Sequence, residues 1–222
     1  DVYKRQVLAV VNGEFSERMA ASAAARGAVV DVIRAEPGGA PDPAEVVGAV
    51  RRGGYKAVIL VRSETSTGVL YPVKGLAEEL SAMGVELLVD DVSGFVGNEI
   101  NMDWGVTALA TCSHKALAAP PGVGIVLLSE GAARALRARP PGVPSSIDLS
   151  LYIEFSSKLE TPFTPPLTVL SALRAALHRV KRVGLENFIE AHRSRSLLLY
   201  ELLTKVGFEP LPASASLRSN TV

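Results

Sequence analysis

Short apolar runs alternate with helical patterns along the first half of this chain. The β-branched runs lie at 7–11, 28–33, 57–61 and 85–90, the helical patterns between them at 16–26, 43–52 and 72–83, and two more apolar runs at 106–110 and 123–128. Such alternation is typical of βαβ units, whose parallel strands are buried on both faces. The sequence therefore predicts an α/β fold with a mainly parallel sheet flanked by helices.

The predicted helices have recognisable ends. Ser16 is suited to cap a helix that starts at Glu17, and Gly27 to end it. Pro43 and Pro72 suit the first turn of the next two helices, since proline lacks the N–H that a first turn leaves unpaired. These signals fix the approximate limits of the first three helices.

The second half of the chain is helical after an interruption. RPPGVP at 139–144 is a cluster of helix breakers, and 145–164 is expected to be an irregular, Ser-rich connection. Helical periodicity returns over 166–183 and 185–205, with Gly184 and Gly207 as stops. We expect one broken helix or two, leading to a second domain that begins near Phe208.

Composition excludes several classes of function. The 222 residues are 48% hydrophobic, enough for a sizeable core, and 23 Lys and Arg balance 23 Asp and Glu. Without a basic excess, binding to nucleic acid or to an anionic membrane surface is disfavoured. No apolar run reaches the roughly 18 residues of a membrane-spanning helix. Cys112, the single cysteine, has no partner for an internal disulfide, so the cytoplasm is the expected compartment.

Three polar residues follow predicted strands. Thr65 comes after the run at 57–61, Asp90 ends the run at 85–90, and Lys115 follows the run at 106–110. In an open parallel sheet, ligands bind outside the carboxyl ends of the strands. The three side chains should therefore converge on one edge, where an acid and a lysine can hold opposite ends of a small aromatic cofactor.

Asp90 and Lys115 are the candidate catalytic residues. A carboxylate at the end of an apolar run is costly unless a cation compensates it, and a lysine amine can form a Schiff base with an aldehyde. The neighbouring Asp91 competes with Asp90 for this role, although strand alternation favours Asp90. A helix cap or loop carboxylate and a surface lysine are the plain structural alternatives.

A family resemblance rests on four motifs. They are SETSTGVLYP at 63–72, Asp90-x-Val92, Ser113-His114-Lys115-Ala-Leu, and Pro120-Pro121-Gly122. Together they resemble class V pyridoxal-phosphate (PLP) aminotransferases of the alanine/serine–glyoxylate type. The resemblance implies a fold-type I large domain over 7–183, followed over 184–222 by a connecting helix and the start of a C-terminal α+β domain. It implies PLP as cofactor and no metal site.

The same resemblance assigns roles around the cofactor. Lys115 would form the Schiff base, and Asp90 would face the pyridine nitrogen. Val92 and Phe15 would cover the two faces of the ring, and Thr65 would contact the ring oxygen. Ser113 and His114 would contact the phosphate. Ordinary core packing by Val92 and Phe15, and turn capping by Thr65, are the alternatives. His114 and Arg62 depart from the family pattern, which commonly has Gln and His there.

Thr164, in TPFTPP, matches a position that reaches the phosphate of a neighbouring subunit in the family. The resemblance therefore implies a homodimer with a shared active site. A threonine that simply precedes a Pro-rich turn is the alternative.

The implied reaction is transamination between alanine or serine and glyoxylate or pyruvate. Other possibilities are a cysteine desulfurase-like lyase and a non-catalytic accessory homologue, since a fold does not fix a function. A desulfurase needs a cysteine on a mobile loop, which Cys112 does not match. A nucleotide-binding Rossmann protein lacks support, because no G-x-G-x-x-G follows the first strand.

Both ends of the chain suggest an internal piece of a longer protein. Residues 1–6 look like a non-native extension, and the chain stops where a strand is approached. By resemblance, a Gly-rich phosphate segment would precede residue 1 and a carboxylate-binding arginine would follow Val222. We therefore expect the 222 residues alone to fold into most of the large domain without transaminating.

Overall fold

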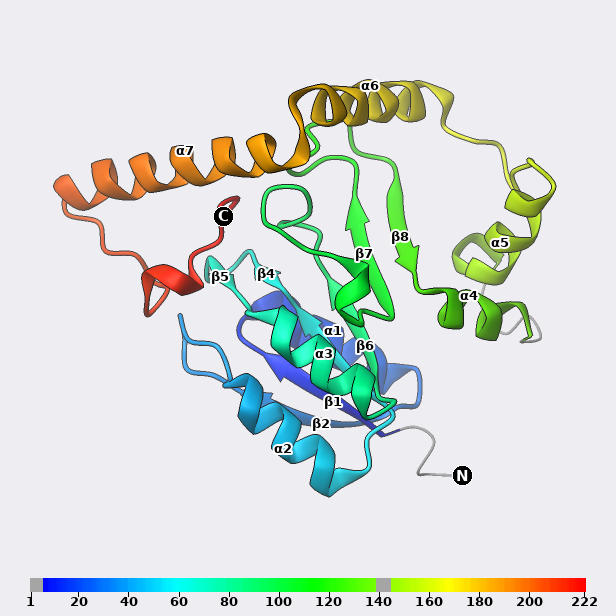
Figure 1. Cartoon of the computed structure of the whole chain (residues 1–222), viewed down its shortest axis with the longest axis horizontal. Helices are drawn as coiled ribbons and strands as arrows, with labels where there is room; N and C mark the ends of the chain where they lie inside the picture. Colours follow the sequence, from blue (N-terminus) through cyan, green and yellow to red (C-terminus); the bar gives the residue numbers. More distant parts are fainter. Residues whose placement is uncertain (1–5, 139–144) are drawn as a thin grey trace.

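The computed structural model describes residues 6–138 and 145–222. Most of the predicted extension at 1–6 and the breaker cluster at 139–144 thus lie outside the described residues. Figure 1 shows a sheet with helices on its faces, from which two long helices, α6 and α7, extend to one side.

The central sheet confirms the predicted fold class. Its six strands in the described residues are β1 (Gln6–Val11), β2 (Val29–Arg34), β3 (Ala57–Val61), β6 (Glu86–Asp90), β7 (Ala108–Cys112) and β8 (Gly124–Leu128). They lie in the order β2-β1-β3-β6-β7-β8, with all pairs parallel except β7 and β8. The two short strands β4 (Ser63–Glu64) and β5 (Val69–Leu70) form a separate hairpin at the carboxyl edge.

Strand alternation divides the core into two layers. Leu8, Val10 and Leu60 point into a cluster with α2 (Pro43–Gly53) and α3 (Val73–Ala82), whereas Ala9 and Ile59 pack with Ala20 of α1 (Glu14–Ala25). Because side chains along a strand point to opposite faces in turn, the same alternation decides which face each residue at the strand end belongs to.

Two predicted starts differ from the structure by two or three residues. β7 begins at Ala108 instead of 106, because a 3-10 turn at Met102–Trp104 is closed by a hydrogen bond from Val106 N to Met102 O. α1 begins at Glu14 instead of Glu17. Ser16 lies inside the first turn, where its Oγ accepts hydrogen bonds from the N–H groups of Asn12 and Gly13.

The connection at 145–164 was predicted to be irregular, which is wrong for its centre. Residues Leu149–Ser157 form α5, and Asp148 caps it by accepting a hydrogen bond from Ser150 N at 2.9 Å. Ser150 lies in the first turn of this helix and also donates its hydroxyl to Asp148, and Ser156 and Ser157 occupy exposed positions in the last turn. Before it, Glu130–Arg137 forms α4, whose N-cap is Ser129.

Residues 166–205 form two helices. α6 (Leu167–Val183) and α7 (Leu185–Lys205) meet at Gly184, whose φ of 87° lies in the left-handed region that favours glycine. After α7 the chain returns along the sheet edge, where Arg218 forms a bridge with Val69 (Figure 1). Within the described residues, we find no helix with the length and apolarity to cross a membrane.

Candidate active site

A cavity of about 640 Å³ lies at the carboxyl edge of the sheet. Thr65 and Lys115 line it. The other lining residues come from loops near these two, from α7 and from the last residues of the chain: Ser93 and Ala116; His192, Arg195, Ser196, Leu199, Tyr200 and Leu203; and Asn220, Thr221 and Val222. The sequence alone did not indicate that α7 and the last residues would form walls. Their contribution depends on the chain reversal after Lys205, for which no local signal exists.

Lys115 lies three residues beyond β7, in a tight loop. Ser113 is fully buried and closes this loop: its Oγ donates to Pro120 O at 2.7 Å and its carbonyl accepts from Ala119 N at 3.0 Å. Ala118 adopts a left-handed φ of 56°, which reverses the chain. Within the described part of the chain, the exposed side chain of Lys115 has no hydrogen bond or ion pair.

The hydroxyl of Ser113 has a hydrogen-bond partner within the loop. Because its hydroxyl proton is donated to Pro120 O, the structure places that proton inside the loop and not toward the cavity. His114 is exposed, and its Nε2 lies 3.8 Å from Cys112 Sγ. Cys112 itself is buried at the end of β7.

Asp90 is the last residue of β6. Its Oδ1 accepts a hydrogen bond from Val92 N at 2.9 Å, which places Val92, also half-buried, directly beside the carboxylate. Burial raises the pKa of Asp90; the Val92 N–H partly offsets this effect, and the charge of Glu64 adds to it. A cation beside Asp90 would therefore stabilise its ionised form.

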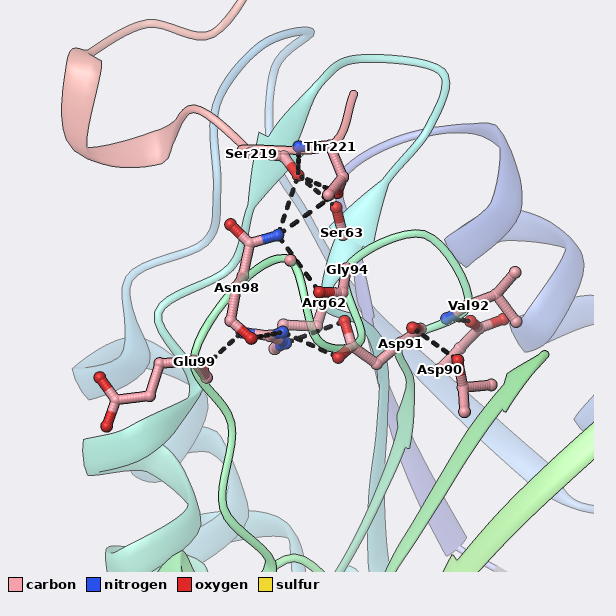
Figure 2. A network of polar contacts seen from close by, with 12 residues as sticks. Arg62, Ser63, Asp90, Asp91, Val92, Gly94, Asn98, Glu99, Ser219 and Thr221 are labelled. Carbon is pink, nitrogen blue, oxygen red and sulfur yellow. Dashed lines mark hydrogen bonds and ion pairs between the residues drawn. The ribbon is translucent and has the colours of Figure 1, made fainter. Parts of the chain in front are cut away.

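Asp91 lies on the other face of the strand end. It is fully buried and binds Arg62 through both oxygens, with Nε–Oδ1 at 2.9 Å and Nη2–Oδ2 at 2.8 Å. Figure 2 shows Asp91 pointing toward Arg62 while Asp90 and Val92 point away from it. Of the two neighbouring acids, Asp90 is thus the one whose charge is not already paired within the described residues.

A pair of hydroxyls lines the same cavity as Lys115. Thr65 Oγ1 lies 2.6 Å from Ser93 Oγ, and both residues line the cavity. Thr65 was predicted, whereas Ser93 was missed. Its position three residues after Asp90, in a turn that follows the strand, is the signal that could have identified it.

Glu64 is a second residue that sequence reasoning missed. It is fully buried and accepts five hydrogen bonds, from the N–H groups of Phe15, Ser16 and Ser66 and the hydroxyls of Ser16 and Ser66. Burial alone would raise its pKa, but these hydrogen bonds together hold the pKa below its ordinary value. Glu64 therefore caps α1 from a distant strand and fixes Phe15 next to Thr65.

Of the predicted site residues, Thr65 and Lys115 line the cavity, whereas the others lie outside its lining: Phe15, Asp90, Val92, Ser113, His114 and Thr164. Phe15, 41% exposed in the first turn of α1, has the Arg18 guanidinium 5.3 Å from its ring centroid. Thr164 is exposed in the connection between α5 and α6. The structure thus gathers Thr65, Asp90, Val92 and Lys115 at one edge, with Phe15 tied to it through Glu64, and leaves Thr164 separate.

Glu64→Gln should destabilise the protein by about 1–3 kcal/mol at pH 7, since an amide NH₂ cannot accept the N–H donors that the carboxylate accepts. The pKa of Glu64 in the folded protein lies below its ordinary value of 4.5. The carboxylate therefore stabilises the folded state fully above pH 4.5, and this stabilisation is lost as the pH falls through the pKa of the folded protein. Denaturant unfolding at pH 7 and at pH 3 measures it. A difference between wild type and variant that grows toward pH 3 would contradict this role.

Comparisons with known proteins agree with this geometry. The family model described as aminotransferase class-V matches residues 3–222. An uncharacterized aminotransferase of Methanocaldococcus jannaschii is 32% identical over 98% of this chain and 57% of its own length. The serine–glyoxylate aminotransferase of Arabidopsis thaliana is 38% identical over 62% of this chain and 35% of its own length.

The structural comparison extends over nearly the whole chain. The crystal structure of an alanine–glyoxylate aminotransferase from Nostoc sp. superposes with a TM-score of 0.89 at 29% identity, and the match covers 99% of this chain and 60% of that one. The chain therefore spans a little over half the length of the proteins that it matches most fully.

Proposed function

The chain belongs to the class V aminotransferases, and from this membership we propose that the protein transfers an amino group from alanine or serine to glyoxylate or pyruvate. The observation that carries the proposal is the placement of Asp90 at the end of β6 and of Lys115 just beyond the neighbouring β7, with the Thr65–Ser93 hydroxyl pair lining the same cavity as Lys115. The names of the Arabidopsis and Nostoc proteins support the substrate class.

The family implies PLP as cofactor, and the chemistry of the residues fits it. A half-buried carboxylate suits a protonated ring nitrogen, an unpaired lysine amine suits an aldehyde, and hydroxyls suit a ring oxygen. Asp90, Lys115 and Thr65 would supply these groups. When bound, PLP supplies an electron sink for the substrate carbon that loses its proton.

The chain's own residues have distinct tasks in this proposal. Lys115 would bind the cofactor covalently and afterwards carry the proton between substrate and cofactor carbons. Asp90 would keep the ring nitrogen protonated. Val92 and Phe15 would cover the two ring faces, which orients the ring and excludes water.

The phosphate contacts follow from the Lys115 loop. Since the Ser113 hydroxyl donates its hydrogen bond to Pro120 O, we assign Ser113 the role of stabilising the loop that carries Lys115. His114, exposed beside Lys115, and backbone N–H groups remain as phosphate donors from this part of the chain.

A cysteine desulfurase-like activity is less compatible with the geometry. Cys112 is buried and lies near His114 at the end of a strand, whereas attack on a substrate sulfur needs an accessible thiolate. An accessory role without catalysis would give no physical reason for an unpaired lysine and a half-buried acid to share one edge.

The proposed activity is tested by the absorbance spectrum of the full-length protein loaded with PLP. Alanine or serine should shift the cofactor absorption, and glyoxylate or pyruvate should reverse the shift. No shift with any amino donor, or sulfide release from cysteine, would overturn the proposal.

We also propose a homodimer in which Thr164 reaches the partner's cofactor phosphate. Its exposed position, outside the cavity lining of its own chain, supports this arrangement. Mixing the inactive variants Lys115→Ala and Thr164→Glu should restore activity, because one site per heterodimer then combines an intact Lys115 with an intact Thr164. The shared site would be contradicted if the mixture stayed as inactive as each variant alone, once the exchange of subunits between the two variants has been verified.

A further inference from the structure

The Arg62–Asp91 ion pair is buried at the carboxyl edge of the sheet. Arg62 is 2% exposed and Asp91 is 0% exposed. Desolvating two charges costs several kcal/mol per ion, and a buried pair adds little net stability compared with apolar residues of the same volume. A role in fixing the positions of its neighbours explains the pair better than a role in stability.

On one side, the pair holds the strand that carries Asp90. The backbone N–H of Arg62 donates to Asp90 O at 2.8 Å, and Asp91 N donates to Ala110 O at 2.9 Å. The guanidinium then fixes the Asp91 side chain from the end of β3. The backbone that orients Asp90 is thus bonded to the strands on both sides.

On the other side, Arg62 holds the loop at 98–99. Its Nη1 donates to Glu99 O at 2.9 Å and its Nη2 to Asn98 O at 3.3 Å. Gly94 packs against the pair so closely that a Cβ there would lie 2.4 Å from Asp91 Oδ1. Arg62 therefore joins the end of β6 to this loop within a tightly packed site.

The side chain of Asn98 extends the connection to the end of the chain. Its Oδ1 accepts from Asn220 N at 3.1 Å, and its Nδ2 donates to Ser219 Oγ and Thr221 Oγ1, both at 3.3 Å. Asn98 and Ser219 are buried, whereas Asn220 and Thr221 line the cavity that also holds Lys115. Figure 2 shows the continuous path from Asp91 through Arg62 and Asn98 to Ser219 and Thr221.

We propose that Arg62 is a positioning residue that fixes two walls of the active site together: Asp90 on the cofactor side, and residues 219–221 on the substrate side through Asn98. The assignment of one wall to the cofactor and of the other to the substrate rests on the proposed function. Arg62 touches neither cofactor nor substrate in it. It acts through Asp91 and through the carbonyl groups of Asn98 and Glu99.

Two variants test the two walls separately: Arg62→Lys should disturb both Asp90 and residues 219–221, and Asn98→Ala should disturb residues 219–221 alone. Lysine keeps the charge but cannot hold both Asp91 oxygens and two carbonyls at once. In the full-length protein, Arg62→Lys should weaken PLP affinity and raise KM, each by roughly tenfold, since misplacement by about 1 Å costs about 100-fold in rate. Asn98→Ala should raise KM while PLP affinity stays within about twofold of wild type, because the path from Arg62 to Asp90 is intact.

A readout without cofactor distinguishes this inference from the proposed function. In the PLP-free protein, hydrogen exchange of the Asn220 amide should be faster in both variants, because this N–H bonds to Asn98 Oδ1. The matched control is Arg51→Lys, in the exposed ion pair with Glu79 at 3.1 Å, which should change none of the three quantities.

The inference would be overturned if Arg62→Lys kept the PLP affinity, the KM and the Asn220 exchange rate of the wild type. It would also be overturned if Asn98→Ala lost PLP affinity as strongly as it raised KM. If the exchange result holds while the protein binds no PLP, the proposed function fails and the structural link remains.

Discussion

Replacing Lys115 with alanine is expected to abolish transamination in the full-length protein. Among the residues that the structure describes, no other lysine lines the cavity, so none of them offers another amine to bind the cofactor aldehyde or to move the substrate proton. The loss of the proton-transfer role alone should lower turnover by about 10²–10⁴-fold. Steady-state assays with alanine and glyoxylate, beside the cofactor spectrum, measure the effect.

The matched control for this variant is Lys181→Ala, which removes an exposed lysine from the last turn of α6. It should keep wild-type turnover and spectrum. The fold should survive in both variants, because the Lys115 loop is closed by Ser113, Ala119 and Pro120 and not by the lysine side chain. Turnover in Lys115→Ala within tenfold of wild type would reject the assignment.

Asp90→Asn is expected to bind PLP but to lose most transamination. Removing an opposite charge next to the ring nitrogen lowers the pKa of that nitrogen by about 1–3 units. The ring then deprotonates near neutral pH and no longer draws electrons from the substrate carbon. The ¹⁵N chemical shift of bound, labelled PLP reports this protonation directly, beside the turnover number.

The neighbouring acid supplies the control for Asp90. Asp91→Asn should lower stability and PLP affinity, because Arg62 loses the charge that compensates it in the core and holds the end of β6 less firmly, while the ring nitrogen of bound PLP stays protonated. If Asp90→Asn has wild-type turnover and Asp91→Asn loses the protonated nitrogen, the roles of the two acids must be exchanged.

The strands and most helices could be predicted because their signals are local. Alternation of apolar and helical patterns located the six sheet strands to within two residues at each end, since burial on both faces demands continuous apolar runs. α5 was missed because its serines and the nearby prolines resemble a loop. The start of α1 was misplaced because its cap comes from Glu64, 48 residues beyond Ser16 in the sequence.

The candidate site was only partly predictable for the same physical reason. Thr65, Asp90 and Lys115 follow strands, and the rule that parallel strands end at one edge brings them together. Ser93 was missed although it follows the same strand end as Asp90, whereas the roles of Glu64 and of the Arg62–Asp91 pair depend on contacts between distant segments, which no local pattern encodes. The sequence identified Arg62 as a departure from the family but could not show that Asp91 pairs with it.

The division into a large domain at 7–183 and a following segment at 184–222 stays a prediction. Residues 219–221 bond to Asn98 and Ser63 at the sheet edge, so the end of the chain is structurally tied to the first domain.

The central claim is that Lys115 and Asp90 hold one PLP molecule at the carboxyl edge of the sheet. Borohydride reduction of the PLP-loaded, full-length protein, followed by proteolysis and mass spectrometry, tests it most directly. The account predicts a reduced cofactor on the peptide that contains Lys115, in stoichiometric amount, and none on that peptide in a control sample from which PLP was removed before reduction. A cofactor attached to any other lysine, or no attachment in a protein that folds and is saturated with PLP, would contradict it.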